Sequence, residues 1–423
     1  HNKKIESHNP NKNTLSHTPI HHLILSYENI PAELAWEMNV PLPQCDMVKF
    51  ESHGTGSVFK PFLEKLGIKV TQHLDENYCA KSAYCSFFND LNQGARILAM
   101  RDYLSVIDDN AKKLYALIPS PQIICLNQVR DPISMLRHYM SIRRLGKAPR
   151  RFNLTFDKDF ILTQLVEYSS AKNHIGSSYY PNLSATEDWL ECRYICFHDT
   201  QLFRELVNIN EKKVSFMDMS EIVGEKTLQT MANFAQLFNV PAPQASDKEF
   251  FLTRSHDFGC LLPLTLYVHQ QDLEKFNTND TDSLTKQGGI TIHILKKFHL
   301  ENKRDISAEI LGNLAHDMVR IAIDKNDEAR LKQNIPLYQR TKEYLQDFIP
   351  SLIEQDAKEK AKKLTEEDVL EHFKKDAQLR AKCKNIFDKH LELIKSHRPD
   401  IVASWKYYQE FEKLSITKPL DKD

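Results

Sequence analysis

Strand-like and helix-like segments alternate from residue 22 to about residue 240, and this alternation constrains the fold more than any other feature of the chain. The clearest strand, 122–128, has consecutive apolar residues, which is typical of a strand buried on both faces. Further segments fit the alternation by their apolar spacing, namely strands at 47–52, 193–197 and 213–218 and helices at 58–67, 96–118, 132–145 and 227–238. The pattern predicts an α/β domain with a mostly parallel sheet and helices on both of its faces.

The chain divides into three parts by composition. Residues 1–20 are polar and rich in Asn, His and Lys, as expected for a tail or linker. The predicted α/β domain occupies 21–300. From 301 to 423 the apolar spacing is helical throughout, so we expect a helical C-terminal region. Within it, Thr365 followed by Asp368 resembles a helix N-terminal cap.

The overall charge balance excludes several classes of protein. The 423 residues include 56 Lys and Arg and 57 Asp and Glu, whereas general nucleic-acid and anionic-membrane binders are far more basic. The eight Cys form no C-x-x-C pair, so we expect reduced thiols and no metal site. No run of about 18 apolar residues occurs, so we expect no membrane span and a cytoplasmic location. The sequence does not indicate an oligomeric state.

A loop of small residues, from Ser52 to Ser57, joins a predicted strand to a predicted helix. Gly54 and Gly56 allow the backbone to turn tightly and bring its N–H groups close to a ligand, while Thr55 and Ser57 add hydroxyl groups. The start of the next helix would add N–H groups and the positive end of its dipole. The segment predicts a phosphate-binding loop, and a plain strand-to-helix turn is the alternative. It lacks the Lys of a Walker P-loop.

Arg130 marks a second candidate site, because it follows the buried strand and begins an Arg-Asp-Pro corner. Open α/β sheets place ligands at this carboxyl edge, and a guanidinium can contact a phosphate through two hydrogen bonds. The stretch 130–151 holds seven Lys and Arg and one Asp, a net charge of +6 in a chain of net charge −1. We therefore expect an anionic ligand here. The alternative is a solvated basic helix face with Arg130 paired to a carboxylate.

Three segments resemble sulfotransferases and occur in that family's order. Residues 126–144 (LNQVRDPISMLRHYMSIRR) resemble the strand-and-helix segment of the glycan 2-O-sulfotransferases, in which the Arg after the strand binds the 3′-phosphate of the donor. The loop SHGTGS resembles the family's 5′-phosphosulfate loop, and 213–241 resembles a later strand and helix. The resemblance implies a P-loop/sulfotransferase-like fold and a 3′-phosphonucleotide donor, bound by Arg130 and by the loop.

The chain departs from the family pattern at several positions. The family's loop Lys falls near Ser52, and the second 3′-phosphate ligand falls at His138, with Ser134 and Ser141 nearby. The segment that supplies the family's usual base, just before the strand, contains no His.

Two further residues complete the predicted site. His53 lies inside the loop, and an imidazole is suited to deprotonating an acceptor hydroxyl near neutral pH, so His53 is the candidate general base. Charge stabilisation would fall to Arg130 and the backbone donors. The family closes a basic loop over the 3′-phosphate, which makes Arg254 in the segment 251–259 a candidate ligand, with Gly259 permitting movement.

The sequence also resembles a bacterial family found with capsule-biosynthesis genes and linked to O-methyl phosphoramidate. The resemblances imply transfer of a sulfuryl or phosphoramidoyl group to a hydroxyl of a capsular polysaccharide. The donor would be 3′-phosphoadenosine 5′-phosphosulfate or a 3′-phosphocytidine diphosphoramidate, and no metal would be required. The alternatives are a non-catalytic, sulfotransferase-like binding protein of the capsule machinery and a relative of P-loop kinases.

Overall fold

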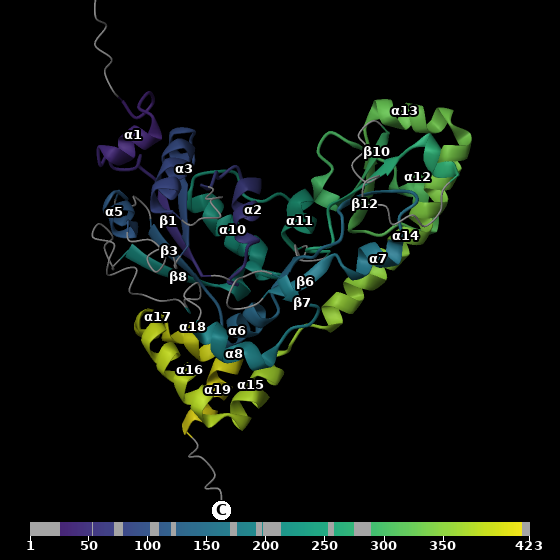
Figure 1. Ribbon diagram of the computed structural model, residues 1–423. Helices are drawn as coiled ribbons and strands as arrows, with labels where there is room; N and C mark the ends of the chain where they lie inside the picture. The colour runs from purple at the N-terminus through teal and green to yellow at the C-terminus, as the bar shows by residue number, and fades with distance from the viewer. Residues whose placement is uncertain are drawn as a thin grey trace, which may run out of the picture.

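The computed structural model describes residues 26–52, 54–71, 79–101, 110–119, 124–169, 176–191, 197, 213–252, 258–274 and 289–416. Figure 1 shows two arms, each built on a sheet, that spread apart from a common base. The C-terminal helices, coloured yellow-green, form the lower end below the first arm.

The first arm contains a four-stranded sheet in which every neighbouring pair is parallel. Its strands, in spatial order, are β2 (Ile97–Arg101), β1 (Met47–Glu51), β3 (Ile124–Val129) and β8 (Val214–Asp218). The strands predicted at 47–52, 122–128 and 213–218 are therefore confirmed. Because β1, β3 and β8 are neighbours, the chain segments that follow them leave the sheet at one edge.

Helices cover both faces of this sheet. Val48 and Phe50 of β1 belong to a buried cluster with three helices, α1 (Ala32–Glu37), α3 (Ala80–Asn92) and α5 (Ala111–Ala116). Met47 belongs to a cluster on the other face, with α2 (Phe59–Lys65), α10 (Lys226–Leu237) and α11 (Lys248–Leu252). Successive strand residues point to opposite faces, so a strand in the middle of this arrangement must be apolar on both sides.

Two helix predictions in this arm were wrong in part. The segment expected to be helical at 96–118 begins with strand β2, whose apolar run pairs with β1, and it ends with helix α5; residues 102–109 lie outside the described residues. A short apolar run fits a buried strand as well as a buried helix, so its spacing could not decide between them. The helix expected at 132–145 is α6 (Pro132–Met140), and strand β4 (Arg143–Leu145) follows it. Apart from Phe197, the predicted strand at 193–197 lies outside the described residues.

Two further sheets carry the second arm and the connection to it. The larger one contains, in spatial order, β11 (Arg304–Asp305), β12 (Val319–Ile323), β10 (Ile290–Lys296), β9 (Leu264–Val268) and β5 (Arg151–Asn153). Only its β5–β9 pair is parallel. The smaller one is antiparallel and contains β4, β6 (Val166–Ser169) and β7 (Gly176–Ser178). The prediction of a mostly parallel sheet therefore holds for the first arm and not for these two sheets.

The helical region predicted from residue 301 also contains strands. At the start of this region, where we expected helix only, the chain forms β11, α12 (Ser307–Leu311) and β12. Strand β12 pairs with β10, so the domain boundary that we placed between 300 and 301 separates two hydrogen-bonded strands of one sheet. The β-branched residues of β12 favour a strand, and pairing on both of its edges completes it.

Beyond β12 the described chain is helical. Its helices are α13 (Lys325–Gln333), α14 (Ile335–Ala361), α15 (Glu366–Lys375), α16 (Ala377–His390), α17 (Glu392–His397), α18 (Pro399–Ser404) and α19 (Lys406–Ile416). Helix α14 runs from the second arm to the base of the molecule (Figure 1). At the start of α15, Thr365 Oγ1 accepts the N–H of Asp368 (3.1 Å), and the N–H of Thr365 donates to Asp368 Oδ2 (2.8 Å). The predicted cap is confirmed.

The last helices share a core with the first arm and are not a loose appendage. Ile133 of α6 lies in one buried cluster with Phe373 of α15 and Phe411 of α19. Asp131 Oδ2 accepts the N–H groups of Tyr407 (3.0 Å) and Tyr408 (3.1 Å) at the start of α19. These contacts fasten the C-terminal helices to the corner that follows β3. Of two further short helices, α8 (Thr186–Leu190) packs against α6 near this base, whereas α7 (Lys158–Thr163) packs against α14 in the second arm.

Candidate functional site

A cavity of about 420 Å³ lies where the three neighbouring strands of the parallel sheet end. Ser52 follows β1, Arg130 follows β3 and Met219 follows β8, and all three residues line the cavity. The carboxyl edge of a parallel sheet is where open α/β folds bind ligands. The sheet topology therefore brings together the two segments that the sequence marked as candidate anion sites.

The small-residue loop forms part of the cavity wall through Gly54, Thr55, Gly56 and Ser57. Its carbonyl groups are held by the protein, because Gln128 Nε2 donates to the carbonyl oxygens of Thr55 (2.6 Å) and Gly56 (3.0 Å). Among the described residues, the backbone N–H groups of Gly56 and Ser57 contact no acceptor. The loop therefore has N–H groups available for an anion, whereas the Thr55 hydroxyl is already used in a hydrogen bond to Ser52 O (2.7 Å).

Both glycines of the loop are required by the space around them. Gly54 has φ +87°, and a Cβ at this position would lie 2.8 Å from His138 Cδ2. Gly56 has φ +119°, and its Cβ would lie 2.9 Å from Gln128 Nε2. A side chain at either position would meet backbone strain and a steric clash together. The loop therefore has glycine at positions 54 and 56 because it packs closely on β3 and α6.

Arg130 contacts the same loop directly. Its Nη1 donates to the carbonyl oxygen of Gly54 (2.9 Å). Burial and the nearby charge of Arg137 lower the pKa of Arg130, but an arginine remains protonated at neutral pH. Position 130 and the loop thus lie side by side at one edge of the sheet, as the sequence predicted.

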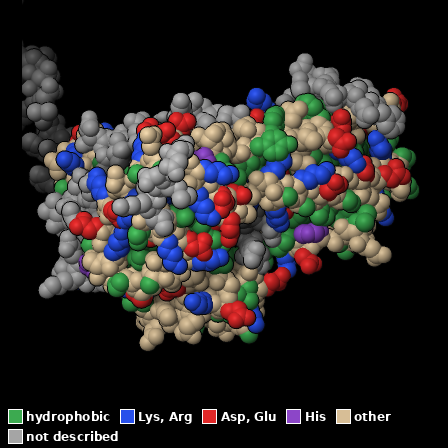
Figure 2. All heavy atoms as spheres, turned by 90° about the horizontal axis from the view of Figure 1, so that it is seen from below, with side chains coloured by type: hydrophobic (Ala, Val, Ile, Leu, Met, Phe, Trp, Pro, Cys, Tyr) green, Lys and Arg blue, Asp and Glu red, His purple; other side chains and the backbone are tan. Residues whose placement is uncertain are grey.

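The cavity concentrates positive charge. Besides Arg130, it is lined by Arg137, Arg143, Arg144 and Lys363, and none of the described residues that line it is Asp or Glu. By contrast, Figure 2 shows Lys and Arg interspersed with Asp and Glu over the face seen from below. In a chain of net charge −1, this focusing of cations favours an anionic ligand.

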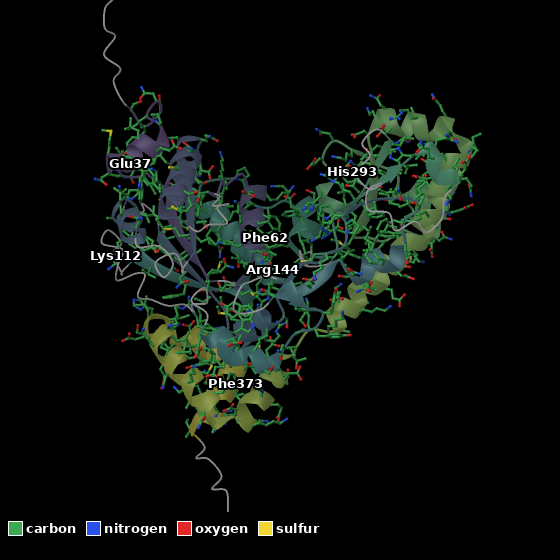
Figure 3. The ribbon with its side chains drawn as sticks, in the orientation of Figure 1. Glu37, Phe62, Lys112, Arg144, His293 and Phe373 are labelled. Carbon is green, nitrogen blue, oxygen red and sulfur yellow. The ribbon has the colours of Figure 1, made fainter. Side chains whose placement is uncertain are left out.

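The cations of the cavity differ in their partners. Arg137 Nε lies 3.2 Å from Glu366 Oε1, and Arg143 Nη1 lies 4.0 Å from Asp356 Oδ1. No ion pair joins Arg144 or Lys363 to a carboxylate within the part of the chain that the structure describes. Burial, with the charges of Arg143 and Arg137, lowers the pKa of Lys363. Figure 3 places Arg144 between the part of the first arm that carries Phe62 and the C-terminal helices.

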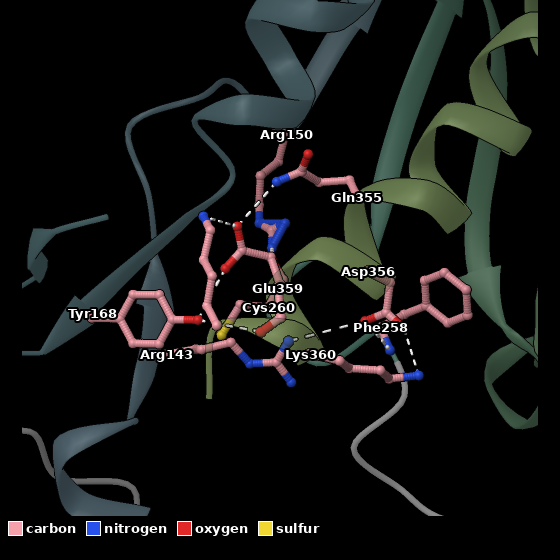
Figure 4. A network of polar contacts seen from close by, with 10 residues as sticks. Arg143, Arg150, Tyr168, Phe258, Cys260, Gln355, Asp356, Glu359 and Lys360 are labelled. Carbon is pink, nitrogen blue, oxygen red and sulfur yellow. Dashed lines mark hydrogen bonds and ion pairs between the residues drawn. The ribbon is translucent and has the colours of Figure 1, made fainter. Parts of the chain in front are cut away.

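Helix α14 fixes one wall of the cavity through two buried carboxylates (Figure 4). Asp356 Oδ1 accepts the backbone N–H of Phe258 (3.2 Å), in the turn that brings Cys260 to the cavity. Glu359 Oε2 accepts the hydroxyl of Tyr168 on β6 (3.1 Å). The C-terminal part of the chain therefore both positions the wall and contributes Lys363 to it.

The remaining predicted site residues have three outcomes. His138 lines the cavity, as does Ser141. Ser134 is not among the lining residues, because its Oγ donates to Glu366 Oε1 (2.8 Å) on the neighbouring helix α15. His53 and Arg254 lie outside the described residues. Gly259, expected to permit movement of a closing loop, lines the cavity.

Lys363 is the cavity residue that sequence reasoning missed. It lies in the charged stretch 354–365, which reads as a solvated helix end. Nothing in the spacing of that stretch shows that its last turn returns to the edge of a sheet formed far earlier in the chain. The signal for an anion site in the sequence was the unusual concentration of Arg in the stretch 130–151.

The described residues contain no group of three or more His, Cys, Asp and Glu that could hold a metal ion. Nor do they contain a helix long and apolar enough to cross a membrane.

Comparison with known protein families gives one match. Residues 216–416 match the model of a family described as "Protein of unknown function (DUF2972)". The match runs from β8 to α19, so it includes Met219, Cys260 and Lys363 of the cavity, whereas the loop and Arg130 precede it. Neither the curated proteins nor the solved structures gave a match.

Proposed function

We propose that this protein transfers a charged group, sulfuryl or phosphoramidoyl, from a 3′-phosphonucleotide donor to a hydroxyl of a surface polysaccharide. The observation that carries the proposal is the shared cavity of the small-residue loop and Arg130, which contains five cationic side chains and, among its described lining residues, no carboxylate. Its volume of about 420 Å³ lies in the range of small-molecule sites.

In this proposal the donor's two phosphates bind at two places. Gln128 holds the carbonyl groups of Thr55 and Gly56, which leaves the N–H groups of Gly56 and Ser57 to contact the 5′-phosphate. Arg130 contacts the 3′-phosphate, and His138 lies beside the loop to help position it. Fixed donors of this kind stabilise the charge that develops during group transfer without reorganising. The general base remains the prediction made for His53.

Binding of the product-like nucleotides tests the proposal most directly. Adenosine 3′,5′-bisphosphate and cytidine 3′,5′-bisphosphate are titrated by calorimetry into the full chain, and we expect one of them to bind. Arg130→Gln should weaken it at least about tenfold, since the loss of a charge-assisted hydrogen bond costs about 1.5–3 kcal/mol.

Arg151→Gln is the matched control, because Arg151 belongs to the same basic stretch but is exposed and does not line the cavity. It should bind like the unmodified protein. If neither nucleotide binds, or if the Arg130 and Arg151 variants behave alike, the proposal is wrong. Binding without any turnover of a sulfuryl or phosphoramidoyl donor would instead favour the non-catalytic alternative.

A further inference from the structure

One part of the cavity wall has no role in the function proposed above. It consists of Ser141 at the end of α6, Arg144 on β4 and Lys363 in the connection between α14 and α15. These residues come from three separate elements, and all three side chains can donate hydrogen bonds.

Ser141 has a buried hydroxyl that makes no hydrogen bond within the described part of the chain. The residue is 6% exposed and lines the cavity, yet no donor or acceptor of the described residues contacts its Oγ. A buried hydroxyl that makes no hydrogen bond costs about 1–3 kcal/mol, so buried polar groups are rarely left in this state. An atom of this kind at a cavity wall indicates a ligand.

Arg144 repeats the observation independently. Its Nε is buried and contacts no acceptor in the segments that the structure describes. Glu167 stands opposite it on β6 in the strand register and is itself buried, but no ion pair joins the two side chains. The chain thus places a carboxylate on the next strand and leaves the guanidinium beside the cavity without it.

Lys363 differs from the lysines just before it. Lys360 pairs with Asp356 (2.7 Å) and Lys362 with Glu359 (2.6 Å), both on α14. Lys363 lines the cavity and has no ion pair with the described residues. Burying cations without acceptors is unfavourable, and an oxyanion between Lys363 and Arg144 would remove that cost.

We propose that Ser141, Arg144 and Lys363 form a second oxyanion subsite, separate from the loop and Arg130, that binds a carboxylate, sulfate or phosphate group. The inference rests on the proposed function only in assigning the donor's two phosphates to the loop and Arg130. The further anionic group then comes either from the acceptor or from a third charged group of the donor.

Crystals of the full chain soaked in tungstate, a tetrahedral oxyanion with strong anomalous scattering, test the subsite. We expect two tungstate positions in the cavity, one beside the loop and Arg130 and one between Ser141, Arg144 and Lys363. Arg144→Gln should remove the second position and keep the first, and Arg130→Gln should do the reverse. An adventitious ion only, whose position survives Arg144→Gln, or a single tungstate shared by all these residues, overturns the proposal.

Thermal-shift titration with inorganic phosphate adds a solution measurement. Arg144→Gln and Lys363→Met should each raise the apparent Kd for phosphate about tenfold. Lys360→Met is the matched control and should leave it unchanged, because Lys360 is already paired. Neither cavity variant should lower the Tm without phosphate, since neither Arg144 nor Lys363 forms an ion pair with the described residues. A lowered Tm with unchanged phosphate affinity means a structural role and overturns the proposal.

Two further ligands identify the source of the anion. If glucose 6-phosphate binds and glucose does not, and Arg144→Gln removes the difference, the group belongs to the acceptor. If Arg144→Gln weakens adenosine 3′-phosphate 5′-diphosphate but not adenosine 3′,5′-bisphosphate, the group belongs to the donor. The subsite and the proposed function fail separately, because tungstate can occupy the subsite in a protein that binds no nucleotide.

Discussion

The cavity is positive because the carboxylates that pair with its Arg side chains lie outside its lining. Asp356 forms an ion pair with Arg143, and Glu366 forms one with Arg137. Neither carboxylate lines the cavity itself. Gln128 and Arg130 hold the carbonyl groups of the loop at Thr55, Gly56 and Gly54. Side chains that take up acceptors in this way leave the donors facing the space that a ligand would fill.

Gly54 gives a sharp test of the loop packing, because Gly94 has the same φ of +87°. A Cβ at Gly54 would lie 2.8 Å from His138, whereas a Cβ at Gly94 meets nothing within 4 Å. Gly94→Ala should therefore cost only the backbone strain, about 1–2 kcal/mol. Gly54→Ala should cost more in free energy of unfolding and should also abolish binding of the bisphosphate nucleotide or of phosphate at the loop.

Urea denaturation and calorimetry measure the two effects. Equal destabilisation by the two substitutions, with ligand binding intact in both, would show that the loop does not need to pack against His138.

Helix α6 is the element that fixes the geometry of the cavity. Its N-terminal cap, Asp131, accepts the N–H of Ile133 (2.9 Å) and those of Tyr407 and Tyr408. One and two turns further on, Ser134 and Arg137 contact Glu366 of α15. The helix is thus held at its start by α19 and along its side by α15. Arg130, one residue before the cap, is positioned by the same contacts.

Asp131 gives this element a pH dependence. Burial raises the pKa of Asp131 to about 6, although backbone hydrogen bonds oppose the shift. In the unfolded chain the pKa of an Asp is about 3.9, so between pH 4 and 6 the folded state binds more protons and stability falls as the pH rises. The cost is fully present above about pH 6 and amounts to about 3 kcal/mol at most.

Asp131→Asn removes this titration. We expect the free energy of unfolding of the unmodified protein, relative to the variant, to decrease between pH 4 and pH 7, as measured by urea denaturation at each pH. A difference that stays constant over this range would mean that Asp131 is ionised in the folded protein throughout.

The whole molecule joins three parts around one cavity. The parallel sheet provides the loop and Arg130, the connection through β4 provides Arg144, and the connection between α14 and α15 provides Lys363. Since the matched family segment 216–416 contains only part of this set, the cavity requires the earlier part of the chain as well. Residues of both arms of Figure 1 therefore line the site, with Gly259 and Cys260, which precede β9, on the side of the second arm.

A shared core predicts that the C-terminal helices unfold together with the first arm. Phe373 is fully buried in the cluster that contains residues of α6 and α19. Phe373→Ala should lower the free energy of unfolding by about 3–5 kcal/mol in one cooperative transition. Phe298→Ala is the control and should cost less than about 1 kcal/mol, because Phe298 is 40% exposed.

Two single-tryptophan backgrounds can follow the two parts separately. Trp36, in the core of the first arm, is kept alone by Trp189→Phe and Trp405→Phe, and Trp405, in the cluster of the C-terminal helices, is kept alone by Trp36→Phe and Trp189→Phe. If Phe373→Ala makes the Trp405 transition come first, while the Trp36 transition keeps its midpoint, the C-terminal region is an independent domain.

The sequence by itself determined the features that depend on neighbours along the chain. The buried runs of β1 and β3, the start of α6 at Pro132, the glycine loop and the cap at Thr365 are all local, and each was predicted from spacing and residue type. The adjacency of the loop and Arg130 also followed, because parallel strands end at the same edge of a sheet.

Only the tertiary structure decided the features that depend on distant partners. The strands β2 and β12 look like helices until β1 and β10 supply their hydrogen bonds. From its neighbours in the sequence Lys363 is expected to be solvated, but the course of α14 places it at the cavity. Ser134 is expected to be a phosphate ligand, but its hydroxyl donates to Glu366 of α15. Local pattern fixes backbone propensity, but which side chains meet is set by packing between segments that the sequence does not place next to each other.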